Sequence, residues 1–262
     1  MRTFTKIIGA CCNHGQPKMG THISPVYLYD QSRHKHPMRY VKKFDDTGTG
    51  YRDLYNLHNS YLHNNNKVIT IGGDHSISLS TVASSVEKYK DDLVVVWVDA
   101  HPDLNTRVSS LTQNIHGMPM ASALGLDNLF DLPTIKPNQL IYFGIRDIDP
   151  YEQHIINTLG IESYSMTKIK QYGLIDILND INRIDAPIHL SFDVDSIDPR
   201  HFKSTGTPVP NGFNIEDVWN IFSILKKNVI STDIVEFNPY LSNNTIKSKE
   251  AKLLNNLIDF MV

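Results

Sequence analysis

Three side chains that can bind a metal ion or move a proton follow the most apolar stretch of the sequence. The five residues Val94–Val98 are apolar and mostly β-branched, a composition typical of a buried strand. Asp99, His101 and Asp103 come next, at alternate positions. Carboxylates and imidazoles are costly to bury unless they are paired or bind a cation. The spacing therefore predicts a metal site just beyond the end of a central strand.

Further acidic and imidazole groups follow other apolar runs in the same way. Asp193 and Asp195 come after the run at 188–192, and His75 follows the run at 68–71 within the sequence GGDHS. With the first group they make four carboxylates and two imidazoles, enough for two cations that share bridging carboxylates. This oxygen-rich set, with one imidazole per cation, suits Mn²⁺ better than Zn²⁺. Two such ions can hold a water between them and lower its pKa toward neutrality, so a hydroxide nucleophile is expected.

Each of these residues has a simpler explanation when it is taken alone. A single Asp after a strand is usually a turn residue or a helix cap, and a single His is more often a buried polar residue than a ligand. The joint pattern is harder to explain in that way. Asp-x-His-x-Asp and Asp-x-Asp both follow strongly apolar runs, where unpaired charges are costly. We therefore expect a binuclear metal site.

Short apolar runs alternate with amphipathic segments along the whole sequence. We expect strands at 6–10, 68–71, 93–98, 140–145, 161–165, 188–192 and 230–237. We expect helices at 52–64, 76–90 with Ser76 as N-cap, 150–159, 214–227 and 247–260. This alternation predicts an α/β fold with three αβα layers and a mostly parallel central sheet, in one domain over residues 1–262. Ligands of such sheets bind beyond the carboxyl ends of the strands, where the candidate metal ligands fall.

Composition restricts the kind of protein. The 262 residues are 40% hydrophobic and 20% charged, and the net charge is −3, which is ordinary for a soluble globular protein. These values give no reason to expect a nucleic acid or a membrane as partner. The first apolar run is too short for a secretory leader, and no segment approaches the length of a membrane span. Cys11 and Cys12 are adjacent, and neighbouring cysteines rarely form a structural disulfide, so a reducing cytoplasm is expected rather than a redox or metal role for the pair.

The sequence resembles the ureohydrolases, the family of arginases and agmatinases, over nearly its whole length. The three signature segments of that family stand at 72–76 (GGDHS), 99–103 (DAHPD) and 191–199 (SFDVDSIDP). Further matches lie at 15–20, 144–150, 205–208 and 236–239. The resemblance implies an arginase-like fold, two Mn²⁺ per subunit, a small guanidino compound as substrate and a homo-oligomer, a trimer or hexamer.

The resemblance also implies a role for each candidate ligand. The first Mn²⁺ would be bound by His75, Asp99, Asp103 and Asp193, and the second by His101, Asp99, Asp193 and Asp195. The shared residues Asp99 and Asp193 would therefore bridge the two ions. Asp103 would also orient the hydroxide, which attacks the guanidinium carbon and yields urea and an amine.

Two further residues match the catalytic machinery of the family. His116 matches the histidine that shuttles a proton to the leaving amine, and the pKa of an imidazole suits that task. Glu236 matches the carboxylate that receives the substrate guanidinium, since a planar cation and a buried carboxylate form a strong, directional pair. Without the resemblance, His116 would be a polar residue at a helix start and Glu236 a structural ion-pair partner.

The segment from Asp99 to His116 matches the arginase branch. Asn105, Thr112 and Asn114 fall where arginases hold the α-carboxylate of the amino acid, and all three offer hydrogen-bond donors. Asp149 falls where arginases receive the α-amino group. Asp149 followed by Pro150 and Glu152 is also a good helix cap, and the two roles are compatible. Thr207, in the matching segment 205–208, is a further candidate for substrate binding.

The sequence departs from the arginase pattern at three places. Gln113 and Asn211 stand where glycine is usual, which suggests backbone shapes that glycine adopts more easily. The chain is also shorter than typical arginases, mainly between the first two strands and after Glu236.

The expected function is hydrolysis of L-arginine to urea and L-ornithine by a manganese-dependent arginase. The alternatives are a ureohydrolase for agmatine or guanidinobutyrate and a non-catalytic metal-binding relative. A deacetylase of similar architecture is also conceivable, but the GGDHS segment and Glu236 argue against it.

Overall fold

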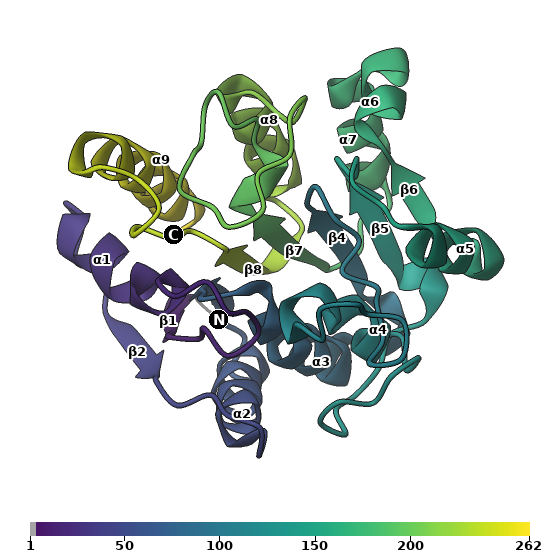
Figure 1. Cartoon of the computed structure of the whole chain (residues 1–262), viewed down its shortest axis with the longest axis horizontal. Coiled ribbons are helices and arrows are strands. Elements are labelled where there is room, and N and C mark those ends of the chain that lie inside the picture. The colour runs from purple at the N-terminus through teal and green to yellow at the C-terminus, as the bar shows by residue number, and fades with distance from the viewer. Residues whose placement is uncertain (1–3) are drawn as a thin grey trace.

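The computed structural model describes residues 4–262 of the chain, and the first three residues of the expected single domain lie outside this range. A single sheet of eight strands forms the centre of the molecule (Figure 1), in the order β2-β1-β3-β8-β7-β4-β5-β6. Every neighbouring pair in this sheet is parallel. The strands are β1 (Thr5–Ala10), β2 (Met38–Val41), β3 (Lys67–Ile71), β4 (Val94–Val98), β5 (Leu140–Phe143), β6 (Glu162–Tyr164), β7 (Ile188–Asp193) and β8 (Val229–Val235).

Helices cover both faces of the sheet, which confirms the predicted three-layer αβα fold (Figure 1). One layer contains α2 (Thr49–His63), α3 (Ser78–Tyr89), α4 (Pro119–Ala123) and α5 (Pro150–Leu159). The other contains α1 (Ser24–Gln31), α6 (Met166–Tyr172), α7 (Leu174–Arg183), α8 (Ile215–Leu225) and α9 (Asn244–Met261). Among residues 4–262, no helix has the length and apolar character needed to cross a membrane.

The two faces of the central strands bury different kinds of side chain. Toward α7, α8 and α9, strand β7 presents Ile188, Leu190 and Phe192 to a large apolar cluster. Its other residues, His189 and Ser191, are also fully buried. The register pairs them with Ser231 and Asp233 of β8, so four polar residues share one face of the sheet. This polar layer lies between the sheet and the α2–α3 pair.

The sequence located most elements but missed several. All seven expected strands are present, with ends that differ by a few residues from the prediction. The prediction missed β2, an edge strand that pairs only with β1, and it missed α1, α4, α6 and α7. The apolar residues Ile177, Leu178 and Ile181 of α7 do follow helical spacing, and that signal could have located this helix.

The start of α3 corrects the predicted N-cap. The carboxylate of Asp74 accepts a hydrogen bond from the backbone nitrogen of Ser76 at 3.1 Å and begins a 3-10 turn over His75–Ile77. The α-helix then starts at Ser78, so the prediction of Ser76 as the cap of α3 is wrong. The reason is that Asp74, two residues before Ser76, caps the 3-10 turn, and this turn continues directly into α3.

Helix α8 offers a test of local stability that lies away from the candidate site. The side chain of Asn214 accepts a hydrogen bond from Asp217 N at 2.9 Å, and the Asp217 carboxylate accepts one from Asn214 N at 3.0 Å. We expect Asn214→Ala to lower the free energy of unfolding by about 1 kcal/mol, because the capping oxygen is lost. Urea unfolding followed by circular dichroism measures the change. Asn214→Asp keeps the acceptor and should remain near wild type, and an alanine variant as stable as wild type would contradict the expectation.

Candidate metal centre and active site

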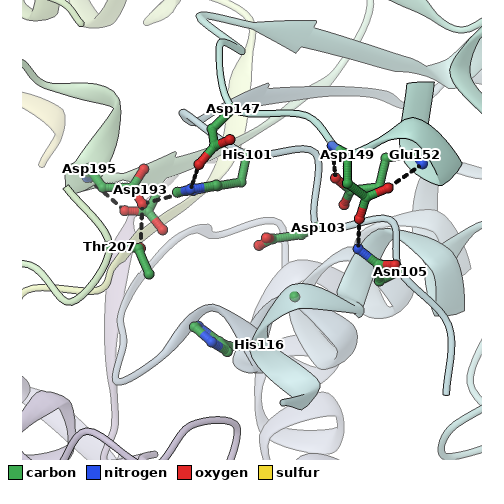
Figure 2. A pocket seen from close by; sticks show the side chains of 11 residues that line it. His101, Asp103, Asn105, His116, Asp147, Asp149, Glu152, Asp193, Asp195 and Thr207 are labelled. Atoms are coloured by element: carbon green, nitrogen blue, oxygen red, sulfur yellow. Dashed lines mark hydrogen bonds and ion pairs between the residues drawn. The ribbon is translucent and has the colours of Figure 1, made fainter. Parts of the chain in front are cut away.

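Five neighbouring strands end at one edge of the sheet, and the candidate residues follow those ends. His75 comes after β3, Glu236 after β8, and Asp193 ends β7. Asp99 follows β4, and Asp149 comes after β5. A cavity of about 260 Å³ opens at this edge (Figure 2), lined by His101, Asp103, Asn105, His116, Gly117, Asp147, Asp149, Glu152, Asp193, Asp195 and Thr207. The position agrees with the rule for open parallel sheets.

His75 is the centre of a buried cluster of carboxylates. Its Nδ1 atom lies 3.0 Å from Asp99 Oδ2, 3.1 Å from Asp103 Oδ2 and 3.2 Å from Asp193 Oδ2. The backbone of Asp103 adopts a left-handed conformation with φ of 50°, which is strained for a side chain of this kind. Three acidic oxygens thus face one imidazole nitrogen.

A second group forms around His101 and shares one residue with the first. His101 Nδ1 lies 3.1 Å from Asp195 Oδ2 and 3.5 Å from Asp99 Oδ1. Asp99 therefore presents one oxygen to each histidine. Thr207 donates a hydrogen bond to Asp195 Oδ2 at 2.8 Å, so the structure places this predicted substrate-binding residue against a candidate ligand.

These two groups fit bound cations. Within residues 4–262, the potential ligand atoms of His75, Asp99 and Asp103, and those of Asp99, His101 and Asp195, lie within 4.8 Å of one another. His75 Nδ1 and Asp99 Oδ2 are buried and 3.0 Å apart, yet neither has the geometry of a hydrogen bond to any partner. Burial and the charges of Asp195 and Asp99 raise the pKa of Asp193 well above its usual value, and burial with Asp99 raises the pKa of Asp103 to about 6. A cation would offset both the burial and the mutual repulsion.

The second ring nitrogen of each histidine has a partner that sequence reasoning missed. His75 Nε2 lies 2.9 Å from Ser191 Oγ, and its ring stacks on Trp97 with centroids 4.0 Å apart. His101 Nε2 lies 3.5 Å from Asp147 Oδ2, at the rim of the cavity. Ser191 and Asp147 both lie in segments that match the ureohydrolases, and this match could have pointed to them as residues of the site.

His116 lies against Glu236 at the cavity. Its Nδ1 atom is 3.1 Å from Glu236 Oε1. Burial by itself would lower the pKa of His116, but the hydrogen bond and charge of Glu236 outweigh burial and raise this pKa to about 9. The imidazole is therefore held in its cationic form at neutral pH.

Glu236 is buried behind His116 and does not line the cavity. Besides His116, its carboxylate accepts hydrogen bonds from His75 N at 2.9 Å and Gln16 Nε2 at 2.6 Å. These three donors keep the pKa of Glu236 below its usual value although burial would raise it. Sequence reasoning missed Gln16, which lies 220 residues away in the matching segment 15–20.

Asn105 and Asp149 lie together on the far wall of the cavity, across Asp103 from Asp193 and Asp195 (Figure 2). Asn105 Nδ2 donates to Asp149 Oδ2 at 2.7 Å. The other oxygen, Asp149 Oδ1, accepts from Glu152 N at 2.9 Å, so the capping box is present at the start of α5. The helix cap thus holds Asp149 at the cavity wall, and the two predicted roles are compatible in geometry.

Thr112 and Asn114 lie in the loop before His116 and do not line the cavity. Thr112 Oγ1 accepts a hydrogen bond from Asn114 N at 3.3 Å instead. Gln113, which lies between Thr112 and Asn114, has a φ of 61°. Asn211, in a different loop, has a φ of 65°. Both positions therefore adopt the left-handed backbone that the glycine of the arginase pattern suggested.

Comparison with known proteins agrees with this geometry. A sequence profile of the Arginase family matches residues 5–258. The arginase of Entamoeba histolytica is 41% identical over 204 residues, which are 74% of this chain and 69% of that protein. Mouse arginase-1 is 31% identical over 283 residues, covering 93% of this chain and 87% of the mouse protein. For the Plasmodium berghei arginase, at 35% identity, the match spans 65% of the relative.

Solved structures show the same fold. The crystal structure of Entamoeba histolytica arginase in complex with L-ornithine has a TM-score of 0.89 and 32% identity, with 98% of this chain and 99% of that chain covered. Arginase from Bacillus subtilis has a TM-score of 0.88 and 28% identity, with 99% and 98% covered. The resemblance to ureohydrolases, and to their arginase branch, is thereby confirmed. Because the family profile covers almost the whole chain, and the mouse relative matches most of both sequences, this chain belongs to the arginase family and is a hydrolase that acts on a guanidino group.

Proposed function

We propose that this enzyme hydrolyses L-arginine to urea and L-ornithine with two Mn²⁺ ions per subunit. The observation that carries the proposal is a single cavity whose two opposite walls carry different groups, candidate metal ligands on one and polar groups suited to an amino acid on the other. One wall holds His101, Asp103, Asp193 and Asp195, and the buried residues His75 and Asp99 complete the two candidate metal groups behind it. The opposite wall holds Asn105 and Asp149, which can bind the amino and carboxylate groups of an amino acid.

The metal ions would be held as the resemblance implies. The first would take His75, Asp99, Asp103 and Asp193, and the second His101, Asp99, Asp193 and Asp195. Carboxylate oxygens dominate this set, and among the described residues neither group contains a thiol, which favours Mn²⁺ over Zn²⁺. When bound, the two ions supply Lewis acidity that lowers the pKa of a water between them.

The residues around the metal groups divide the remaining tasks. Asp103 reaches into the cavity and accepts a hydrogen bond from the attacking water, which orients it. His116, held cationic by Glu236, donates a proton to the amine that leaves the guanidinium carbon. The negative charge of Glu236 favours a guanidinium in this part of the site. Thr207 fixes Asp195 through its hydrogen bond.

We also propose a single domain, a reducing cytoplasm and a homo-oligomeric assembly for this chain. One domain over residues 1–262 agrees with a single sheet that joins strands from Thr5 to Val235. A reducing cytoplasm agrees with Cys11 and Cys12, which are both free thiols in the structure. A homo-oligomer, trimer or hexamer, is supported by membership of the arginase family.

Substrate preference tests the proposal directly. Urea release should be measured with Mn²⁺-loaded enzyme from L-arginine, agmatine and 4-guanidinobutyrate. We expect kcat/KM for L-arginine to exceed the others by at least about 100-fold, because agmatine offers no carboxylate to Asn105 and 4-guanidinobutyrate offers no amine to Asp149. Preference for agmatine would overturn the arginase assignment within the family. The absence of urea from all three compounds would support a non-catalytic relative.

Removal of one bridging candidate tests the metal model. We expect Asp193→Ala to lose bound Mn²⁺ and to lower urea release by at least about 100-fold, because this carboxylate would serve both ions. Metal analysis by mass spectrometry after desalting gives the Mn²⁺ content per chain. Asp176→Ala, an exposed aspartate on α7, is the matched control and should keep both metal and activity. Full Mn²⁺ content in Asp193→Ala would rule out the bridging role.

His116 can be tested separately from the metals. We expect His116→Asn to retain both Mn²⁺ ions while kcat falls by about 10²- to 10⁴-fold, the range for loss of a general acid. Steady-state kinetics and metal analysis of the same preparation separate the two effects. Recovery of part of the rate with added imidazole would support proton donation. A variant with the wild-type rate would remove His116 from the mechanism.

A further inference from the structure

A line of buried hydrogen bonds runs from His75 away from the cavity and ends at a carboxylate. His75 Nε2 lies 2.9 Å from Ser191 Oγ, which lies 3.3 Å from Ser78 Oγ. Ser78 Oγ donates to Asp233 Oδ2 at 2.8 Å. Each of the four side chains is at most 1% exposed. The line therefore has no contact with solvent between the metal group and Asp233.

The fold brings these residues together from three separate elements. Ser191 on β7 and Asp233 on β8 are paired in the sheet register, so their side chains lie on the same face. Ser78 is the first residue of α3, which packs on that face. Ser78 and Asp233 are 155 residues apart in the sequence.

Asp233 determines which group donates and which accepts in each hydrogen bond of this line, because its carboxylate is an acceptor of several hydrogen bonds. The same oxygen that Ser78 reaches also accepts from Thr81 Oγ1 at 2.5 Å and lies 3.0 Å from His189 Nε2. Burial alone would raise the pKa of Asp233, but His189 and the Thr81 hydroxyl lower it below its usual value. An ionised carboxylate has no proton to donate, so Ser78 must give its single proton to Asp233.

The remaining protons follow from that direction. With its proton committed to Asp233, Ser78 can only accept from Ser191. With its own proton committed to Ser78, Ser191 can only accept from His75, so the Nε2 atom of His75 must carry a proton. The lone pair of a neutral His75 then lies on Nδ1, the atom that faces Asp99, Asp103 and Asp193.

We propose that Ser78 and Asp233 are positioning residues that hold His75 in the tautomer whose Nδ1 binds the first metal ion. This inference rests on the proposed metal binding by His75. It is specific to one site, because the matching nitrogen of His101 has a different partner among the described residues: Asp147, whose side chain is 67% exposed, at 3.5 Å. A buried partner that fixes a ligand in this way strengthens metal binding by about 10- to 100-fold in other proteins.

Two serines of α3 provide a matched pair of variants. Ser78 and Ser85 are both fully buried, and Ser85 Oγ lies 2.8 Å from His189 Nδ1 in the same polar layer. Of these two serines, Ser78 lies between Asp233 and His75, whereas Ser85 lies on the far side of Asp233, behind His189. Mn²⁺ is titrated into the metal-free full chain, and free Mn²⁺ is followed by electron paramagnetic resonance. We expect Ser78→Ala to weaken one of two sites by about 10- to 100-fold, and we expect Ser85→Ala to bind as wild type.

A second measurement reports the tautomer itself. In ¹⁵N-labelled protein loaded with diamagnetic Zn²⁺, the His75 ring should show a proton on Nε2. We expect Ser78→Ala and Asp233→Asn to shift that resonance, Ser85→Ala to leave it in place, and Ser78→Thr to restore both the resonance and the Mn²⁺ affinity. Wild-type affinity in Ser78→Ala, or equal losses in the two serine variants, would overturn the inference.

The outcome is separable from that of the proposed hydrolysis because both measurements omit the substrate. A wild-type chain that binds Mn²⁺ but releases no urea would reject the arginase reaction and still support the inference if the serine variants differ as expected. Active wild-type enzyme with no difference between the variants would reject only the inference. A wild-type chain that binds no Mn²⁺ would overturn both.

Discussion

Four carboxylates buried around two imidazoles are the constraint on which the rest of the structure depends. Asp99, Asp103, Asp193 and Asp195 are all at most 9% exposed, and they lie too close together for each to ionise freely. Two imidazoles cannot neutralise four such charges. The folded chain therefore fits a state in which cations occupy the groups, and binding of these ions couples to the stability of the fold.

The parallel sheet can hold these buried charges close together because several strands and the loops after them share in positioning the acidic side chains. Neighbouring strands bring their ends to one edge, so Asp193 ends a strand, and Asp99 directly follows one, that has a parallel neighbour on each side. Where a side chain must turn sharply toward the cavity, the backbone takes on strain. Asp103, which lines the cavity, adopts a positive φ of 50°, and the buried Glu236 behind His116 adopts one of 64°.

The polar layer beneath β7 and β8 also serves the candidate metal site. An apolar core on this side would leave His75 Nε2 without a partner, because the ring already faces carboxylates at its other nitrogen. Ser191 and the residues behind it supply that partner from within the core. The opposite face of the same strands packs against α7, α8 and α9 mainly through apolar side chains, and it provides the rigid support. One pair of strands thus combines a structural face and a face that serves the site.

The sequence by itself determined the class of fold, the positions of the strand ends and the types of ligand, because these follow from local patterns. Apolar runs ended by Asp and His reveal buried strands and the chemistry that follows them, as in 94–103. Only the tertiary structure decided which oxygen faces which imidazole, that Gln16 holds Glu236, and that Asp233 stands behind His75. It also placed Thr112 outside the cavity. Such contacts join residues far apart in the chain, and they depend on which strands become neighbours in the sheet, which local hydrophobic periodicity does not specify.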